Sequence, residues 1–186
     1  MILVNGRYTV RLSMEATPVL DGYPVWFRAE DAWEQDFFCA RLIEVDCANG
    51  DKYRFALTDH LLSGGEECAV LEDDILTVIL FDSIVQIDLN NRIIINRVEC
   101  ENIGGLQGIR RCGKRYILKG ECSIFGYDNS LKRMWVFDGR DIFTRANGEE
   151  CFWTDNGSIH CRDWAGWHYV LDMDGNLIGE VCEKHL

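Results

Sequence analysis

One segment of the chain comes close to a phosphate-binding loop. Gly108–Arg115 reads GIRRCGKR, which matches the first seven positions of the pattern G-x-x-x-x-G-K-[ST]. The eighth position should carry the hydroxyl that ligates magnesium, and here it is Arg115. A phosphate loop also opens a helix, whereas the apolar run Tyr116–Leu118 predicts a strand. We therefore expect no nucleotide hydrolysis and no cofactor; the basic segment is expected to be a solvated loop and strand face, with weak anion binding as the alternative.

A second segment resembles a calcium loop in spacing only. Asp172, Asp174 and Asn176 follow the ligand spacing of an EF-hand, with Glu183 at the twelfth position. The sixth position must be glycine for the sharp turn, and here it is Leu177. The flanking residues favour strands rather than helices. The segment is therefore predicted to be an Asp-Gly hairpin turn.

The thiols and imidazoles of the C-terminal part could ligate a transition metal. The candidates are Cys151, His160, Cys161, His168, Cys182 and His185. A structural zinc site needs four convergent ligands, and the sequence has no Cys-x-x-Cys, only the single spacing Cys182-x-x-His185. We predict no metal site. The cysteines number nine, an odd count spread along the chain, which indicates reduced thiols used as small apolar residues.

No arrangement typical of a nucleophilic enzyme is present. A serine or cysteine nucleophile needs a histidine held by a third group, and no G-x-S-x-G elbow occurs. A pair of catalytic carboxylates depends on separation in space, so the 31 acidic residues leave a hydrolase open as an alternative. The leading prediction is a protein without catalytic activity.

An aromatic cluster near the C-terminus is the strongest candidate for binding. It consists of Asp163, Trp164, Trp167 and Tyr169. Tryptophan and tyrosine dominate the energetics of protein interfaces and also line ligand pockets. The competing interpretation is that these side chains cap the core.

Tight turns divide the sequence into short strand-like runs. Asn-Gly or Asp-Gly pairs occur at Asn5-Gly6, Asp21-Gly22, Asn49-Gly50, Asp138-Gly139, Asn147-Gly148, Asn156-Gly157 and Asp174-Gly175. These pairs tolerate the positive φ angles of two-residue hairpin turns. In the run 52–57, Tyr53, Phe55 and Leu57 share one face and charged residues the other, as in a half-buried antiparallel strand. The pattern predicts an all-β protein with at most one or two short helices.

A short pattern recurs in the second part of the chain. Ser-Ile-x-x-x-Asp occurs at Ser83–Asp88, Ser123–Asp128 and Ser158–Asp163, with starts 40 and then 35 residues apart and strand-like runs on both sides. A stranded repeat of this length is typical of a β-propeller blade. We predict repeated antiparallel meanders in a small propeller-like array, in which a four-unit ring would be the smallest closed form. A β-barrel or β-sandwich is the alternative.

The repeats suggest how the domain is organised. We predict one compact domain over residues 1–186, with a possible division into an irregular β region (1–74) and three meanders (75–186). The two short helix candidates, Glu30–Phe38 and Asp59–Ser63, both fall in the first part.

Composition narrows the class of partner. The net charge is −12, which disfavours nucleic acid and anionic membranes and is compatible with a basic protein partner. The sequence shows neither a signal peptide nor an apolar run long enough for a membrane helix, so a cytoplasmic protein is predicted. The leading function is a non-catalytic recognition protein, for example an inhibitor or immunity-type protein. The alternative is a module that binds a small ligand or carbohydrate.

Overall fold

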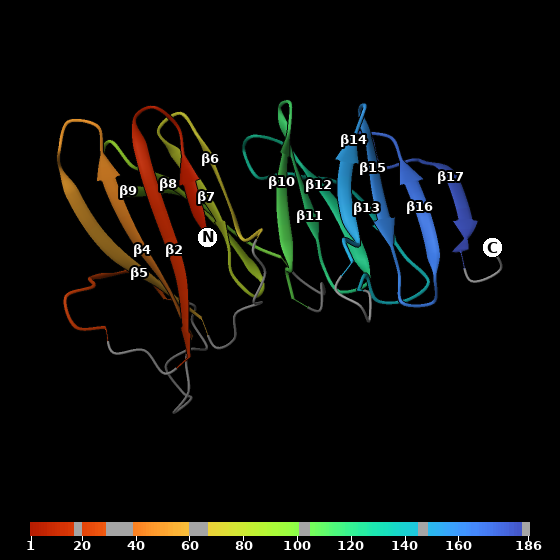
Figure 1. Ribbon diagram of the computed structural model, residues 1–186, viewed down its shortest axis with the longest axis horizontal. Helices are drawn as coiled ribbons and strands as arrows, with labels where there is room; N and C mark the ends of the chain where they lie inside the picture. The colour runs from red at the N-terminus through yellow and green to blue at the C-terminus, as the bar shows by residue number, and fades with distance from the viewer. Residues whose placement is uncertain (17–19, 29–38, 60–66, 101–104, 145–148, 184–186) are drawn as a thin grey trace.

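The protein is built from β-strands arranged in four sheets (Figure 1). The computed structural model describes residues 1–16, 20–28, 39–59, 67–100, 105–144 and 149–183, and these ranges contain no α-helix. The predicted all-β class with antiparallel meanders is confirmed. The helix candidate Glu30–Phe38 lies outside the described residues. Of the second candidate, Asp59–Ser63, only Asp59 is described, as the last residue of a strand.

The first sheet has five strands and the least regular order. Its strands follow one another as β1 (Ile2–Val4), β2 (Tyr8–Ala16), β4 (Cys39–Cys47), β5 (Lys52–Asp59) and β3 (Val25–Arg28). All neighbours are antiparallel except β3, which runs parallel to β5. Alternation sets the faces of this sheet, because Ile43 and Val45 are fully buried while Glu44 between them is exposed.

The other three sheets are four-stranded meanders. The second contains β6 (Ala69–Glu72), β7 (Ile75–Ile79), β8 (Ser83–Asp88) and β9 (Ile93–Glu99). The third contains β10 (Gly108–Cys112), β11 (Arg115–Lys119), β12 (Ser123–Tyr127) and β13 (Arg133–Asp138). The fourth contains β14 (Phe152–Asp155), β15 (Ser158–Arg162), β16 (Trp167–Leu171) and β17 (Leu177–Cys182). In each sheet the strands pair in sequence order.

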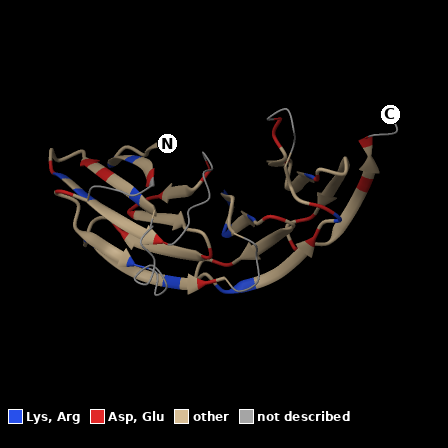
Figure 2. Ribbon diagram, turned by 90° about the horizontal axis from the view of Figure 1, so that it is seen from below, with Lys and Arg blue, Asp and Glu red and all other residues tan. Residues whose placement is uncertain are grey.

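The sheets meet face to face and follow an open arc. Phe55 of the first sheet, Ile84 of the second and Tyr116 of the third belong to one buried cluster. Ile117 and Ile159 belong to another, which joins the third sheet to the fourth. Figure 2 shows the first and fourth sheets at opposite ends of the arc. The array is therefore propeller-like, but its four sheets do not close into a ring.

The structure corrects the third copy of the sequence repeat. Ser83–Asp88 and Ser123–Asp128 begin on the third strands of their sheets, whereas Ser158–Asp163 begins on the second strand, β15. The true counterpart in the fourth sheet is Trp167–Asp172, which lacks the Ser-Ile start. Every strand of a meander alternates in the same way, so the short pattern matched the wrong strand.

The corrected alignment shows a turn that is built three times. Asp88, Asp128 and Asp172 each end or follow the third strand and accept a hydrogen bond from an amide of their own turn at 2.8–2.9 Å. Hydrogen bonds from side chains and amides of the turn lower the pKa of all three carboxyls; the largest contribution comes from the Asn91 amide at Asp88, from the Ser130 side chain at Asp128 and from the Asn176 side chain at Asp172. The aspartate therefore fixes the connection to the fourth strand by an Asx-type turn.

A β-bulge follows each of these turns. The pairing of third and fourth strands shifts by one residue between Gln86 and Ile87, between Gly126 and Tyr127, and between Val170 and Leu171. The extra residues on the fourth strands are Ile95, Met134 and Ile178. A bulge redirects the side chain that it inserts, and here it does so at equivalent positions in three sheets.

Candidate protein-binding surface

Two of the four predicted binding residues, Asp163 and Tyr169, are buried in the fourth sheet. The Asp163 carboxylate accepts hydrogen bonds from the Tyr169 hydroxyl at 2.7 Å and from the Trp167 amide at 2.8 Å. The Tyr169 oxygen in turn accepts the Arg140 amide at 3.1 Å. Burial, and then the bond to Asp163, raises the pKa of Tyr169, so the hydroxyl stays protonated and can donate. This arrangement fixes the connection between β15 and β16.

The two tryptophans of the cluster differ in exposure. Trp164 is half exposed, at 50% of its surface. Trp167 lies beneath the Arg140 guanidinium, whose Cζ is 3.7 Å from the ring centroid, and Arg140 also pairs with Glu180 at 3.0 Å. Of the four predicted residues, Trp164 is therefore the one whose ring a partner could contact most directly.

The three bulges form an apolar row that the sequence analysis missed. The exposed fractions of Ile95, Met134 and Ile178 are 48%, 50% and 59%. Three neighbours on the same fourth strands, Ile93, Val136 and Val181, are also exposed. Large apolar side chains are normally exposed singly, and their recurrence on one structural position suggests a contact surface. We call Ile95, Met134 and Ile178 the bulge row.

The bulge row lies on the outer edge of the array. The first strands of neighbouring sheets contact one another, β1 with β6 and β6 with β10, and so form the inner edge. The fourth strands lie at the opposite edge of their sheets. A partner could therefore contact the outer strands of adjacent sheets without entering the arc. An alignment of the sequence on Asp88, Asp128 and Asp172 could have located the bulge row. The bulge residue follows the aspartate by seven positions in the second sheet and by six in the third and fourth.

Charge is interspersed along the arc rather than gathered in one patch (Figure 2). The basic segment that resembles a phosphate loop is the tight hairpin of β10 and β11, in which Cys112 pairs with Arg115. Its arginines are paired: Arg110 contacts Glu67, Arg111 contacts Glu72 at 3.0 Å, and Arg115 contacts Asp174 at 2.7 Å. The hairpin geometry and this neutralisation leave no phosphate cradle in the segment.

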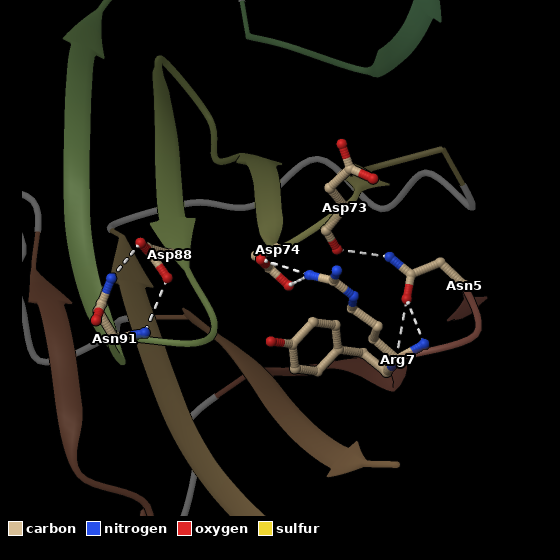
Figure 3. A network of polar contacts seen from close by, with 7 residues as sticks. Asn5, Arg7, Asp73, Asp74, Asp88 and Asn91 are labelled. Atoms are coloured by element: carbon tan, nitrogen blue, oxygen red, sulfur yellow. Dashed lines mark hydrogen bonds and ion pairs between the residues drawn. The ribbon is translucent and has the colours of Figure 1, made fainter. Parts of the chain in front are cut away.

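The junction of the first two sheets carries a polar network (Figure 3). The Arg7 guanidinium donates to both carboxylate oxygens of Asp74, each at 2.9 Å. The Asn5 amide donates to the backbone oxygen of Asp73 at 2.6 Å, while its own carbonyl oxygen accepts the amides of Arg7 and Tyr8. The turn before β2 is thus held against the turn between β6 and β7.

A hollow of about 260 Å³ lies beside this network. Arg7, Asp51 and Arg92 are among the residues that line it, and Arg92 pairs with Asp51 at 3.1 Å. Because both of its arginines already bind carboxylates, the hollow offers little to an anionic ligand.

The segment with calcium-loop spacing forms a hairpin turn between β16 and β17. The Asp172 carboxylate accepts hydrogen bonds from the backbone amides of Asp174 and Asn176 within the turn. No three His, Cys, Asp or Glu side chains gather as metal ligands among the described residues, and the candidate His185 lies outside them. In the same part of the chain, no helix has the length and apolar character to cross a bilayer.

Comparisons with known proteins inform the fold. No family model matches the chain, and no curated protein matches it either. Among solved structures, BamB from Moraxella catarrhalis superposes with a TM-score of 0.52 at 12% identity, over 80% of this chain and 46% of that one. A chain of a mitotic checkpoint complex gives a TM-score of 0.49 at 12% identity, over 66% of this chain and 40% of that one.

The chain thus spans less than half the length of either structure. At 12% identity such a likeness speaks for the fold alone. Together with the four radially arranged sheets, it shows that this chain has a β-propeller-like fold.

Proposed function

We propose that the protein is a non-catalytic recognition module that binds another protein along its outer strands. The observation that carries the proposal is the bulge row, in which Ile95, Met134 and Ile178 are each about half exposed at equivalent positions of three sheets. Three apolar side chains on the outer strands of three successive sheets can be desolvated together by one partner, without the cost of ordering a loop.

The charge of the chain supports a basic partner, which we propose it meets in the cytoplasm. A net charge of −12 attracts a cationic protein over long range and raises its association rate at low salt. The apolar row would then supply short-range contact after encounter. An inhibitor or immunity-type protein that captures a basic toxin or nuclease is the concrete form of this proposal.

The test is affinity purification from the native host with a matched pair of variants. The test variant combines Ile95→Thr, Met134→Gln and Ile178→Thr, which keep the net charge and change the size little while removing apolar surface. The control combines Ile2→Thr and Met14→Gln, which change exposed apolar residues of the first sheet. Mass spectrometry should find a basic protein at low salt with wild type and control, and at least about tenfold less with the test variant.

Two outcomes would reject this proposal. Absence of any basic protein from the wild-type sample at low salt would reject the basic partner. Equal recovery with the test and control variants would reject the bulge row as the contact surface.

Trp164 supports a second candidate function, the binding of a small ligand or carbohydrate. Its half-exposed indole lies close in sequence to Trp167, whose ring is covered by Arg140. Sugars stack on exposed indoles of this kind. Tryptophan fluorescence against a panel of glycans and metabolites should change for the wild type and not for Trp164→Ala; no change with any compound would remove this candidate.

A further inference from the structure

The fourth sheet has an aromatic and imidazole face at the end of the arc. His160 Nδ1 and His168 Nε2 are 3.1 Å apart, and the Trp153 ring stacks on His160 with centroids 5.0 Å apart. Cross-strand pairing places Val170 beside His160 and Val181 beside His168 on the same face. We call Trp153, His160, His168, Val170 and Val181 the fourth-sheet end face.

Equivalent positions in the preceding sheets are buried junctions. His160 and His168 correspond in strand and register to Ile117 and Ile124 of the third sheet. Both isoleucines are fully buried, in the cluster that joins the third sheet to the fourth. The fourth-sheet end face thus occupies the place at which each earlier sheet packs on its successor, and no other sheet of the described chain covers it.

An earlier junction shows how polar side chains at these positions are used. Thr77 of the second sheet corresponds to His160, and together with Gln86 it holds the hydroxyl of Tyr116 in the third sheet, at 3.0 and 3.2 Å. Polar groups on this face therefore hydrogen-bond across to a neighbouring sheet. The imidazole pair can do the same with a hydroxyl or a carboxylate.

The opposite end of the arc presents charges of both signs. The outward face of the first sheet lines a hollow of about 480 Å³, where the carboxylates of Glu44 and Asp46 lie among the cations of Arg11, Lys52 and Arg54. Glu44 is exposed and accepts a hydrogen bond from the Tyr23 hydroxyl at 2.7 Å. We call this the first-sheet end face. Asp46 pairs with Arg11 at 2.6 Å and with Lys52 at 3.2 Å, so Glu44 is the carboxylate that can accept a hydrogen bond from an imidazole N–H of the other end face.

We propose that two copies of the chain join head to tail, with the fourth-sheet end face of each on the first-sheet end face of the other. The two identical junctions would continue the sheet-on-sheet packing that already runs through the arc and would close a ring of eight sheets. A head-to-tail contact closes when its rotation permits, and the second junction then forms within one complex at high effective concentration. The likeness to a longer chain, of which this one covers 46%, fits a half-ring.

The test is the oligomeric state of the whole chain, measured by light scattering and sedimentation. Wild type should be a dimer of twice 21.4 kDa. Glu44→Arg changes one end face and Val181→Arg the other, and each hits both junctions of the ring. We expect about a tenfold loss at each junction, and so about a 100-fold rise in the dimer dissociation constant for either variant.

Matched controls keep folding and the proposed function separate from dimerisation. Glu99→Arg and Val136→Arg make the same changes at exposed positions on outer strands away from the end faces, and both should stay dimeric. Circular dichroism and melting confirm that each variant is folded. The partner-binding variant of the bulge row should also remain a dimer, so failure of one proposal does not resemble failure of the other.

Several outcomes would overturn the proposal. One such outcome is a wild type that stays monomeric at about 100 μM, which is about 100 times a dissociation constant of 1 μM. Loss of the dimer in only one of the two end-face variants would indicate a contact of like faces instead. Open chains larger than a dimer would show that the ring does not close.

Discussion

Replacing Tyr169 by phenylalanine should destabilise the fold without affecting partner binding. The hydroxyl that is lost donates to the fully buried carboxylate of Asp163 at 2.7 Å and accepts the Arg140 amide at 3.1 Å. The ring itself stays in place, against Phe137 and Phe143. The substitution therefore tests the hydrogen bonds and not the packing.

The magnitude follows from what the substitution leaves unsatisfied. A buried carboxylate that loses one of its hydrogen bonds costs about 1–3 kcal/mol, and we take about 2 kcal/mol for Tyr169→Phe. For a chain of 186 residues, each kcal/mol lowers the melting temperature by about 2–4 °C. The melting temperature should thus fall by about 4–8 °C.

Urea and thermal denaturation measure the effect, and Tyr23→Phe is the matched control. The Tyr23 hydroxyl also donates to a carboxylate, Glu44, at 2.7 Å, but this bond is exposed. Its loss should change stability by less than about 0.5 kcal/mol. A Tyr169→Phe protein that melts like the wild type, or one that keeps its stability and loses its partner, would refute the structural role assigned to the Asp163 bond.

Three further predictions concern pH, thiol reactivity and packing. Burial, followed by the charge of nearby Arg162, lowers the pKa of His168, so the unfolded chain binds the proton more readily than the folded one. The contribution of His168 to stability should therefore be complete above about pH 6.5 and should be lost as the pH falls below that value. Urea midpoints measured across this range should fall less steeply for His168→Gln than for the wild type. Burial raises the pKa of Cys161 to about 12, so a thiol reagent followed by peptide mapping should label exposed Cys122 in the native protein and Cys161 only after unfolding. Gly126→Ala should cost about 1–3 kcal/mol in chemical denaturation, because the added Cβ would lie 2.2 Å from the Trp135 ring.

Much of the fold could be predicted from local chemistry. Asn156 and Gly157 both adopt positive φ, 47° and 78°, in the tight turn between β14 and β15 that the Asn-Gly pair predicts. Alternation also located strands such as β5. Alternation does not say which strand of a meander a run will form. The Ser-Ile-x-x-x-Asp pattern therefore groups Ser158–Asp163 with two third strands although it begins on a second strand.

The candidate surface was harder to predict than the fold. A bulge inserts one residue and breaks the two-residue period, so Ile95, Met134 and Ile178 looked like ordinary members of apolar strands. The aromatic cluster in the sequence also predicts binding roles for Asp163 and Tyr169. Both are instead buried and hydrogen-bonded to each other, which the sequence does not reveal. Alignment on the turn aspartates would have brought the three bulge residues together.

The repeated bulge has a further consequence for the behaviour of the protein at high concentration. Among the described residues, the outer strands β9, β13 and β17 are the last strands of their sheets, and an unpaired edge of a flat strand would invite a strand from another molecule to add to the sheet. An inserted residue twists and interrupts the ladder, so a straight foreign strand cannot stay in register along it. The irregularity that exposes apolar side chains on this edge thus also protects the molecule against fibril-like polymerisation.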